Sequence, residues 1–334
     1  MSKDILIYRT DRIGDLLVSM PAISSIKNKL VNSKITLITS DKNYEYAKSF
    51  NIFDNIHIFP KSGLIAKIKF IIELSRNKFD YTFIFDGKER SLISALFVNS
   101  IYKIAMLTEK KLHFIYRFFK IIYVTDRKTK DIIDVHQKML DRTDMGVKIS
   151  QFDFIKSKKD NNFSSQINID NFIHLHLNEK WFSDIYIKKY TNINPGYEEF
   201  TDFIINLSKK NNLLISTGLV DFDLLNLLKE KFFIKHSNKI YYKKNENTYI
   251  YLIYKPSLND LESLFKKSKL LILCHSGIIH AANSFGIKII DILEEVRHDW
   301  YLRWSSYLKN YNFIYRNRFN ILKDKIINQV NSLE

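Results

Sequence analysis

The sequence contains little cysteine, proline or glycine, with one, four and eight residues respectively among 334. The single cysteine, Cys274, excludes an internal disulfide and any zinc site built on several cysteines, so a reducing compartment fits. Scarce glycine and proline exclude collagen-like and low-complexity chains. No 18 successive uncharged apolar residues occur, and the opening MSKDILIYRT is not apolar enough for a signal peptide. These absences predict a cytoplasmic protein without a membrane-spanning helix.

Several nucleotide and nucleic-acid motifs are also missing. The sequence has no GxGxxG, which argues against a classical dinucleotide site, and no GxxxxGK[ST], which argues against a P-loop. The net charge of +16 nevertheless implies an anionic partner, which could be nucleic acid, a membrane surface or a phosphorylated substrate. Basic residues are spread over the whole chain without an RNP-like motif, zinc-finger spacing or a long basic arm. Charge alone therefore selects none of these partners.

Short apolar strands alternate with helical segments along the chain, and this pattern predicts parallel sheets built from βαβ units. The polar stretch 156–171 interrupts the alternation, which then restarts. We therefore predict an α/β protein with two Rossmann-like domains whose parallel sheets face a central cleft. The predicted ranges are 1–158 for the first domain, 159–318 for the second, and 319–334 for a C-terminal helix that returns to the first domain.

The first candidate site is the stretch IYRTDRIGDLLVSMPAI, residues 7–23, which joins a buried strand to a helix expected over 15–31 and kinked at Pro21. Open α/β sheets bind ligands at the carboxyl ends of their strands, where this turn lies. Gly14 would allow a tight turn or close approach to a ligand. Asp15 falls in the first helical turn, where the helix dipole stabilises a negative charge. This position suits a catalytic carboxylate, but also an ordinary helix cap.

Two further stretches lie at predicted strand ends. In LILCHSGIIHAANSFG, residues 271–286, Ser276 and Gly277 open a helix whose free amides would form an anion site, and His280 follows one turn later. The alternative is a cap and a half-buried histidine. In HLHLNEKW, residues 174–181, Lys180 could neutralise a phosphate or simply be solvated. The pair Asp221 and Asp223 has the D-x-D form of some metal sites, but it opens a helix where acidic residues are ordinary.

Taken together, these stretches resemble the lipopolysaccharide heptosyltransferases of glycosyltransferase family 9. RTDRIGDLLVSMPAI follows the family's opening R-x-D-x-[I/L]-G-D with P-A-[I/L], and HSGIIHAANSFG follows D-[S/T]-G-x-x-H-x-A-x-x-x-G. Between them, KFDYTFIFDG and NEKWFSD resemble weaker family motifs. The likeness runs in order from about residue 4 to residue 304.

The resemblance implies a GT-B fold and an inverting, metal-independent transfer from ADP-heptose to a lipid-linked saccharide of the lipopolysaccharide core, without a cofactor. It implies that Asp15 is the general base and that Lys180, Ser276, Gly277 and His280 bind the donor. Arg9, Arg12 and Gly14 would then lie on the acceptor side, the two arginines attracting an anionic acceptor. The partners implied are a nucleotide sugar, an anionic acceptor and the inner membrane surface, but no nucleic acid.

Two departures from the family pattern leave the donor open. His275 stands where the family has an acidic residue that contacts the donor sugar, and Leu293-Glu294-Glu295 replaces an expected glycine. A transferase of the same fold with another donor sugar, an inactive family member and a basic nucleic-acid-binding protein are therefore the alternatives. The aromatic and basic stretch 110–124 suits either a membrane interface or a buried helix with a basic face.

Overall fold

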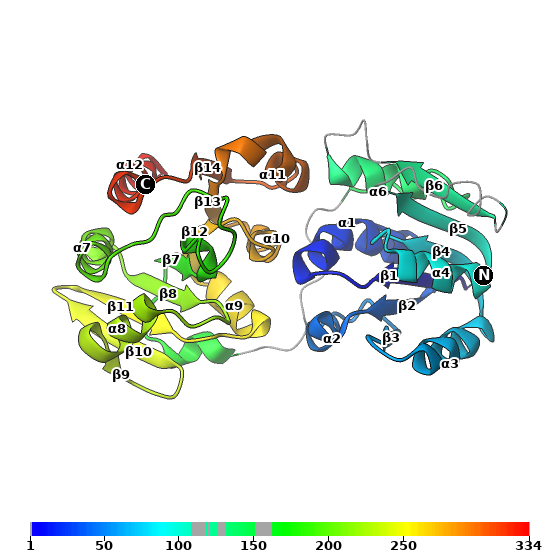
Figure 1. Cartoon of the computed structure of the whole chain (residues 1–334), viewed down its shortest axis with the longest axis horizontal. Coiled ribbons are helices and arrows are strands. Elements are labelled where there is room, and N and C mark those ends of the chain that lie inside the picture. Colours follow the sequence, from blue (N-terminus) through cyan, green and yellow to red (C-terminus); the bar gives the residue numbers. More distant parts are fainter. Residues whose placement is uncertain (1, 108–117, 119, 126–130, 151–161, 334) are drawn as a thin grey trace. The chain divides into compact units, whose positions relative to one another are not determined.

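The computed structural model describes residues 2–107, 118, 120–125, 131–150 and 162–333. The stretch 110–124, a candidate membrane interface, lies largely outside these residues. The chain forms two compact units, Met1–Lys159 with Leu302–Tyr307 and Asp160–Tyr301 with Leu308–Glu334 (Figure 1). Each unit is described by itself. Among the described residues, no helix is both long and apolar enough to cross a membrane.

The first unit is built on a six-stranded parallel sheet in the order β3-β2-β1-β4-β5-β6. Its strands are β1 (Asp4–Arg9), β2 (Lys34–Thr39), β3 (Asn55–Ile58), β4 (Lys78–Ile84), β5 (Asn99–Leu107) and β6 (Ile121–Thr125). The described helices are α1 (Ile13–Lys29), α2 (Asp41–Ala47), α3 (Leu64–Ser75), α4 (Glu89–Phe97) and α6 (Ile132–Leu140). Helix α1 continues through Pro21 and begins two residues earlier than the sequence predicts.

The second unit contains an eight-stranded sheet in the order β14-β13-β12-β7-β8-β11-β10-β9. Its strands are β7 (Phe172–Leu177), β8 (Leu213–Thr217), β9 (Ile234–Lys235), β10 (Ile240–Asn245), β11 (Thr248–Ile253), β12 (Ser268–Cys274), β13 (Lys288–Leu293) and β14 (Tyr311–Tyr315). Its longer helices are α7 (Tyr197–Ser208), α9 (Leu258–Phe265), α11 (His298–Ser305) and α12 (Phe319–Leu333); α11 runs on into residues that cluster with the first unit. The shorter α-helices are α8 (Asp223–Leu227) and α10 (Ile278–Asn283). A π-helical turn, η3 (Leu228–Phe232), continues α8. The short 3₁₀ segments are η1 (Asn162–Gln166), η2 (Glu179–Trp181) and η4 (Glu295–Arg297).

One edge of the second sheet is antiparallel, which the sequence analysis did not predict. Strand β10 pairs with β11 as a hairpin in which Asn245 faces Thr248 across a two-residue turn. Glu246 occupies the left-handed region there, with φ of 50°, as the first residue of a tight hairpin turn requires. Without β9 and β10, the second sheet has the same strand order as the first. The strand order therefore reverses at equivalent places in the two sheets: between the parallel neighbours β1 and β4 in the first, and between β7 and β12 in the second.

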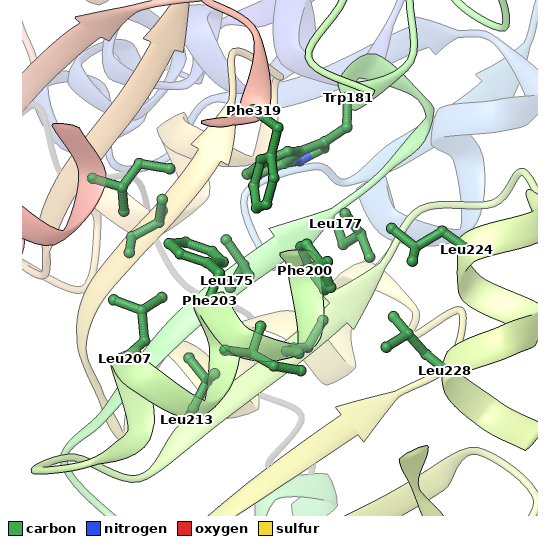
Figure 2. Close-up of a cluster of buried hydrophobic side chains, with 14 of the residues drawn as sticks. Leu175, Leu177, Trp181, Phe200, Phe203, Leu207, Leu213, Leu224, Leu228 and Phe319 are labelled. Carbon is green, nitrogen blue, oxygen red and sulfur yellow. The ribbon is translucent and has the colours of Figure 1, made fainter. Parts of the chain in front are cut away.

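The core of the second unit includes the C-terminal helix (Figure 2). Trp181 is fully buried, and its ring centroid lies 6.4 Å from that of Phe200 and 6.5 Å from that of Phe319. Buried residues recur along α12 at one helical face: Phe319, Leu322, Ile326 and Val330. This face packs beside α7 in the second unit. The sequence led us to expect residues 319–334 to return to the first unit, whereas in the structure the apolar face of α12 completes the core of the second.

Two histidines of β7 are buried around one hydroxyl group. His174 Nε2 lies 2.7 Å from Ser216 Oγ, and His176 Nδ1 lies 2.8 Å from the same oxygen. A hydroxyl has one proton, so it can donate to one imidazole while it accepts from the other. Burial lowers the pKa of His176 to about 3 and that of His174 well below its usual value. Both rings are therefore neutral in the folded protein.

These depressed pKa values predict a loss of stability in acid. The unfolded chain binds protons near pH 6.5 whereas the folded chain does not, so the stabilisation is complete above about pH 6.5 and falls as the pH is lowered towards the folded pKa. For each such histidine, the unfolding free energy should fall by about 2 kcal/mol as the pH is lowered from about 7 to about 5. Denaturant unfolding at several pH values measures this slope. His176→Gln should reduce the pH dependence of the unfolding free energy by about one proton, whereas exposed His57→Gln should leave it unchanged. An unchanged pH dependence in His176→Gln would contradict a neutral, buried His176.

Candidate functional site

In the first unit, a buried arginine organises the turn between β1 and α1. Arg9 is 1% exposed, and its guanidinium donates from Nη1 to the Phe85 carbonyl at 2.5 Å and from Nε to the Asp15 carbonyl at 2.6 Å. It also pairs with Asp11 at 3.3 Å. Arg9 therefore ties the start of α1 to the end of β4. The expectation that Arg9 attracts an anionic acceptor is not supported, because its charge is buried and used within the turn.

A buried carboxylate holds the same edge of the sheet from the β4 side. Asp86 Oδ2 accepts hydrogen bonds from Thr10 N at 3.0 Å, Thr10 Oγ1 at 2.6 Å and Ser91 Oγ at 2.7 Å. The next residue, Gly87, has a φ of 54°, and a Cβ atom there would lie 2.4 Å from the Met106 carbonyl oxygen. The Asp86-Gly87 pair at the end of KFDYTFIFDG is therefore required by the structure of this loop. It fixes the loop at the switch point between β1 and β4.

Carboxylates gather around this turn. Asp15 is half-buried in the first turn of α1, and its Oδ2 accepts from Arg12 N at 3.2 Å. Burial raises the pKa of Asp11 to about 6; Arg9 opposes this shift, while Asp15 and Asp86 add to it. Asp11 Oδ1 and Arg9 Nη2 are buried without a hydrogen-bond partner in the described part of the chain. Such groups are rare in folded proteins, and they occur where a ligand or water completes the bonding.

The other two predicted residues of this turn differ in exposure and conformation. Arg12 is exposed, so its side chain remains available to an anionic ligand. Gly14 is the second residue of α1. It therefore continues the helix, and the tight turn expected from it is absent. Its missing side chain leaves the start of α1 uncovered.

In the second unit, Lys180 joins the ends of the two strands that flank the switch point. Its ammonium donates to the His275 carbonyl at 2.6 Å and lies 5.0 Å from the ring centre of Tyr186. Lys180 follows β7 and His275 follows β12, and these strands are neighbours in the sheet. The structure thus brings together two sequence stretches that lie 95 residues apart. Lys180 is only half-buried, so part of it is open to solvent.

A second buried arginine supports the Lys180 loop. Arg316 is 7% exposed and donates to the carbonyls of Lys180 at 2.7 Å and Thr191 at 3.0 Å. Its Nε lies 3.5 Å from Glu294 Oε2, and Glu294 accepts in turn from Thr191 N at 2.8 Å. Glu294, which stands near the position of an expected glycine, is therefore a buried partner of Arg316. Sequence reasoning missed Arg316, whose only signal is an arginine directly after an apolar strand.

His275 is held by a fully buried carboxylate. Its Nδ1 lies 2.6 Å from Asp291 Oδ2, which also accepts from the Tyr311 hydroxyl at 2.9 Å. Asp291 is 0% exposed, and its Oδ1 has no partner among the described residues. The Tyr301 ring packs on the imidazole with centroids 4.5 Å apart. The imidazole of His275 is thus held between the Asp291 carboxylate of strand β13 and the Tyr301 ring.

The remaining predicted donor residues lie at the start of α10. Ser276 Oγ is buried without a hydrogen-bond partner in the described structure, and Gly277 is the N-cap of the six-residue helix. His280 is 4% exposed, and burial lowers its pKa to about 3. His280 is therefore neutral and offers no positive charge to a phosphate. Lys180, whose ammonium lies on the His275 carbonyl, is the predicted donor residue that carries a positive charge at this edge.

The described residues contain no group of three or more histidine, cysteine, aspartate or glutamate side chains that could hold a metal ion. Asp221 of the D-x-D pair accepts from Lys255 Nζ at 2.6 Å and from the Tyr254 hydroxyl at 2.8 Å. The pair with Lys255 lowers the pKa of Asp221. Its carboxylate thus has partners within the protein.

No protein-family model and no curated protein matches this sequence. Solved structures do match. A glycosyltransferase family 9 protein of Veillonella parvula superposes with a TM-score of 0.70 at 16% identity, over 99% of this chain and 89% of that one. The ADP-heptose lipopolysaccharide heptosyltransferase II of E. coli gives 0.67 at 9% identity, over 99% and 98%. The E. coli heptosyltransferase WaaC, solved with ADP-2-deoxy-2-fluoro heptose, gives 0.65 at 12% identity, over 98% and 99%. The chain therefore has the two-domain α/β fold of these glycosyltransferases, which confirms the predicted GT-B fold class.

The buried position of Arg9 predicts a structural rather than a binding role. Arg9→Lys keeps the charge but cannot reach both the Phe85 and Asp15 carbonyls with a planar group. It should lower the unfolding free energy by about 3–5 kcal/mol, as breaking a buried, hydrogen-bonded charge does. Exposed Arg12→Lys should change it by less than about 0.5 kcal/mol. Denaturant unfolding of both variants measures this, and equal stabilities would refute the role assigned to Arg9.

Proposed function

We propose that this protein is an inverting, metal-independent glycosyltransferase. It transfers a sugar from a nucleoside-diphosphate donor, held by the second unit, to a hydroxyl of an anionic lipid-linked saccharide, held by the first unit. The observation that carries the proposal is the Lys180 ammonium on the His275 carbonyl, at the switch point of a heptosyltransferase-like fold. The sequence motifs suggest ADP-heptose as donor and a lipopolysaccharide core as acceptor.

The second unit would act on the leaving group. Lys180 would move its ammonium from the His275 carbonyl to the donor diphosphate, where an ion pair with phosphate oxygens replaces a hydrogen bond to an uncharged carbonyl. The unpartnered Ser276 hydroxyl and the amides near Gly277 would supply further donors. As the bond from the anomeric carbon to the diphosphate oxygen breaks, the leaving nucleoside diphosphate gains negative charge. Fixed donors at that position lower the barrier.

The first unit would act on the nucleophile. The acceptor hydroxyl oxygen attacks the anomeric carbon from the face opposite the diphosphate, and its proton passes to the Asp15 carboxylate. One carbon–oxygen bond forms while another breaks, so the configuration inverts. Asp15 is the preferred base because it is partly exposed in the first turn of α1, whereas Asp86 is 6% exposed and bonded to its own loop. Arg12 would contact the anionic part of the acceptor.

One observation favours a donor other than ADP-heptose. A carboxylate at position 275 would accept hydrogen bonds from sugar hydroxyls, whereas His275, whose Nδ1 is engaged by Asp291, can only present its Nε2 edge. With its Nδ1–H given to the Asp291 carboxylate, the imidazole offers one acceptor nitrogen where a carboxylate would offer two oxygens, so a sugar with a single hydroxyl donor at this point would suit that edge. Transfer from another nucleotide sugar by the same residues is therefore the second candidate. With either donor, peripheral contact with the cytoplasmic face of the inner membrane would bring the enzyme to its lipid-linked acceptor.

Replacing Lys180 tests the donor site. Lys180→Ala should weaken binding of the nucleoside diphosphate by about 1.5–3 kcal/mol, or roughly tenfold or more in Kd, because a charged contact is lost. The matched control is Lys188→Ala, an exposed lysine of the same loop, which should leave the affinity unchanged. Calorimetric titration of both variants measures the difference. If Lys180→Ala binds as tightly as Lys188→Ala, Lys180 does not hold the diphosphate.

Replacing Asp15 tests the base. Asp15→Asn keeps the shape of the first helical turn but removes the proton acceptor, so transfer should slow by about 10²–10⁴-fold. Donor affinity and melting temperature should change little, because the asparagine oxygen can still accept the hydrogen bond from Arg12 N. Asp11→Asn serves as the comparison, since the pKa of Asp11 is raised to about 6 and it lies beside Asp15. A parental rate in Asp15→Asn, or a larger loss in Asp11→Asn, contradicts the assignment.

A further inference from the structure

Helix α3 (Leu64–Ser75) exposes an apolar face. Four aliphatic residues on it have exposed fractions of 73%, 72%, 47% and 48%: Leu64, Ile65, Ile68 and Ile72. Their spacing places them on one side of the helix. Of the twelve residues in α3, only Leu74 is buried. Single exposed aliphatic residues are common, but four on one face of a short helix are a patch that calls for a partner.

The opposite face of α3 already packs on the sheet. Leu74 belongs to the hydrophobic cluster over β1, β4 and β5, and Phe70 packs against that cluster. The Phe70 ring centroid lies 5.4 Å from that of Phe59. The helix is therefore attached by one side, and burial in its own unit does not explain Ile65 and Ile68.

The neighbouring helix α4 (Glu89–Phe97) extends the apolar surface. Ile93 and Phe97, four residues apart, are 45% and 58% exposed. Helices α3 and α4 contact each other and bury their inner sides in the same cluster (Figure 1). We name the six residues Leu64, Ile65, Ile68, Ile72, Ile93 and Phe97 the α3–α4 patch. It lies on the sheet face covered by α3 and α4, whose inner residues share one hydrophobic cluster.

The charges beside the patch are mainly positive. Residues 61–76 contain four basic residues and one acidic residue, Glu73. Lys69 and Arg76 are exposed on α3 and just after it, and Lys61 pairs with Asp41. Protein interfaces are depleted of lysine, whereas helices that lie in a membrane interface carry lysine and arginine beside apolar residues. The whole chain has a net charge of +16, which adds attraction to an anionic surface.

We infer that the α3–α4 patch is a membrane-docking surface, in which the aliphatic side chains enter the headgroup region of an anionic bilayer while Lys69 and Arg76 contact lipid phosphates. The patch is short and two helices carry it, so the binding is reversible. The inference does not depend on the proposed reaction, because docking requires neither donor nor acceptor. It also differs from the stretch 110–124, which suggested membrane contact from its sequence alone.

Co-sedimentation with lipid vesicles tests this inference. The parent protein should bind vesicles of phosphatidylethanolamine and phosphatidylglycerol, and should bind phosphatidylcholine vesicles much more weakly. Ile65→Gln combined with Ile68→Gln should reduce the partition coefficient about tenfold or more, because two apolar anchors are lost. Lys69→Gln combined with Arg76→Gln should reduce it roughly fivefold for each charge, and added salt should remove the difference.

Matched variants control for exposure and folding. Val31→Gln and Ile234→Gln replace aliphatic residues that are 72% and 61% exposed elsewhere, and they should bind vesicles like the parent. All variants should keep the parental melting temperature, because the replaced side chains are exposed. Failure of the parent to bind anionic vesicles, or equal losses in patch and control variants, overturns the inference. So does a dimer in sedimentation equilibrium that Ile65→Gln with Ile68→Gln dissociates while vesicle binding is unchanged.

Discussion

Two buried arginines use their donors on main-chain carbonyls, and the arrangement of both candidate sites depends on them. Arg9 bonds the carbonyls of Phe85 and Asp15 in the first unit, and Arg316 bonds those of Lys180 and Thr191 in the second. A buried guanidinium is costly unless its donors find acceptors, so the carbonyls that each arginine bonds are held in place, while Nη2 of each has no partner among the described residues. The loops that contain these carbonyls carry Asp15 and Lys180. The two candidate side chains are thus positioned by loops that these buried arginines hold.

Some of the buried polar atoms without partners within the described ranges lie beside the two candidate sites. Arg9 Nη2 and Asp11 Oδ1 in the first unit, and Ser276 Oγ and Asp291 Oδ1 in the second, are buried without partners in the described residues. Arg9, Asp11 and Ser276 lie at the ends of strands that flank the reversal of strand order, and Asp291 lies on the next strand, β13. A buried unbonded polar group costs about 1–3 kcal/mol, so a fold keeps such groups where a ligand repays the cost. The two units repeat one device, and this supports a two-substrate reaction.

Local patterns in the sequence predicted the elements and the positions of the site loops. The elements were predicted from apolar runs such as those of β1 and β7. The site loops were predicted from the Gly-Asp and Ser-Gly pairs that follow strands. Sequence could not predict which polar groups meet, because these pairs are distant along the chain: Asp86 bonds Thr10 across 76 residues, and Arg316 bonds Lys180 across 136. For the same reason the sequence alone could not show that Arg9 is buried against the Phe85 and Asp15 carbonyls, or that α12 packs in the second unit.

The central claim is that the second unit binds a nucleotide sugar, and thermal unfolding with a panel of nucleoside diphosphates and their sugars tests it most directly. A ligand that binds only the folded state stabilises it by about 2.7 kcal/mol at a concentration of 100 Kd. The account predicts that one nucleoside diphosphate, with or without its sugar, raises the melting temperature clearly above the matching monophosphate, because Lys180 and the loop after β12 face a second phosphate. Equal or absent shifts for every diphosphate, at concentrations that saturate known nucleotide-sugar enzymes, would contradict it.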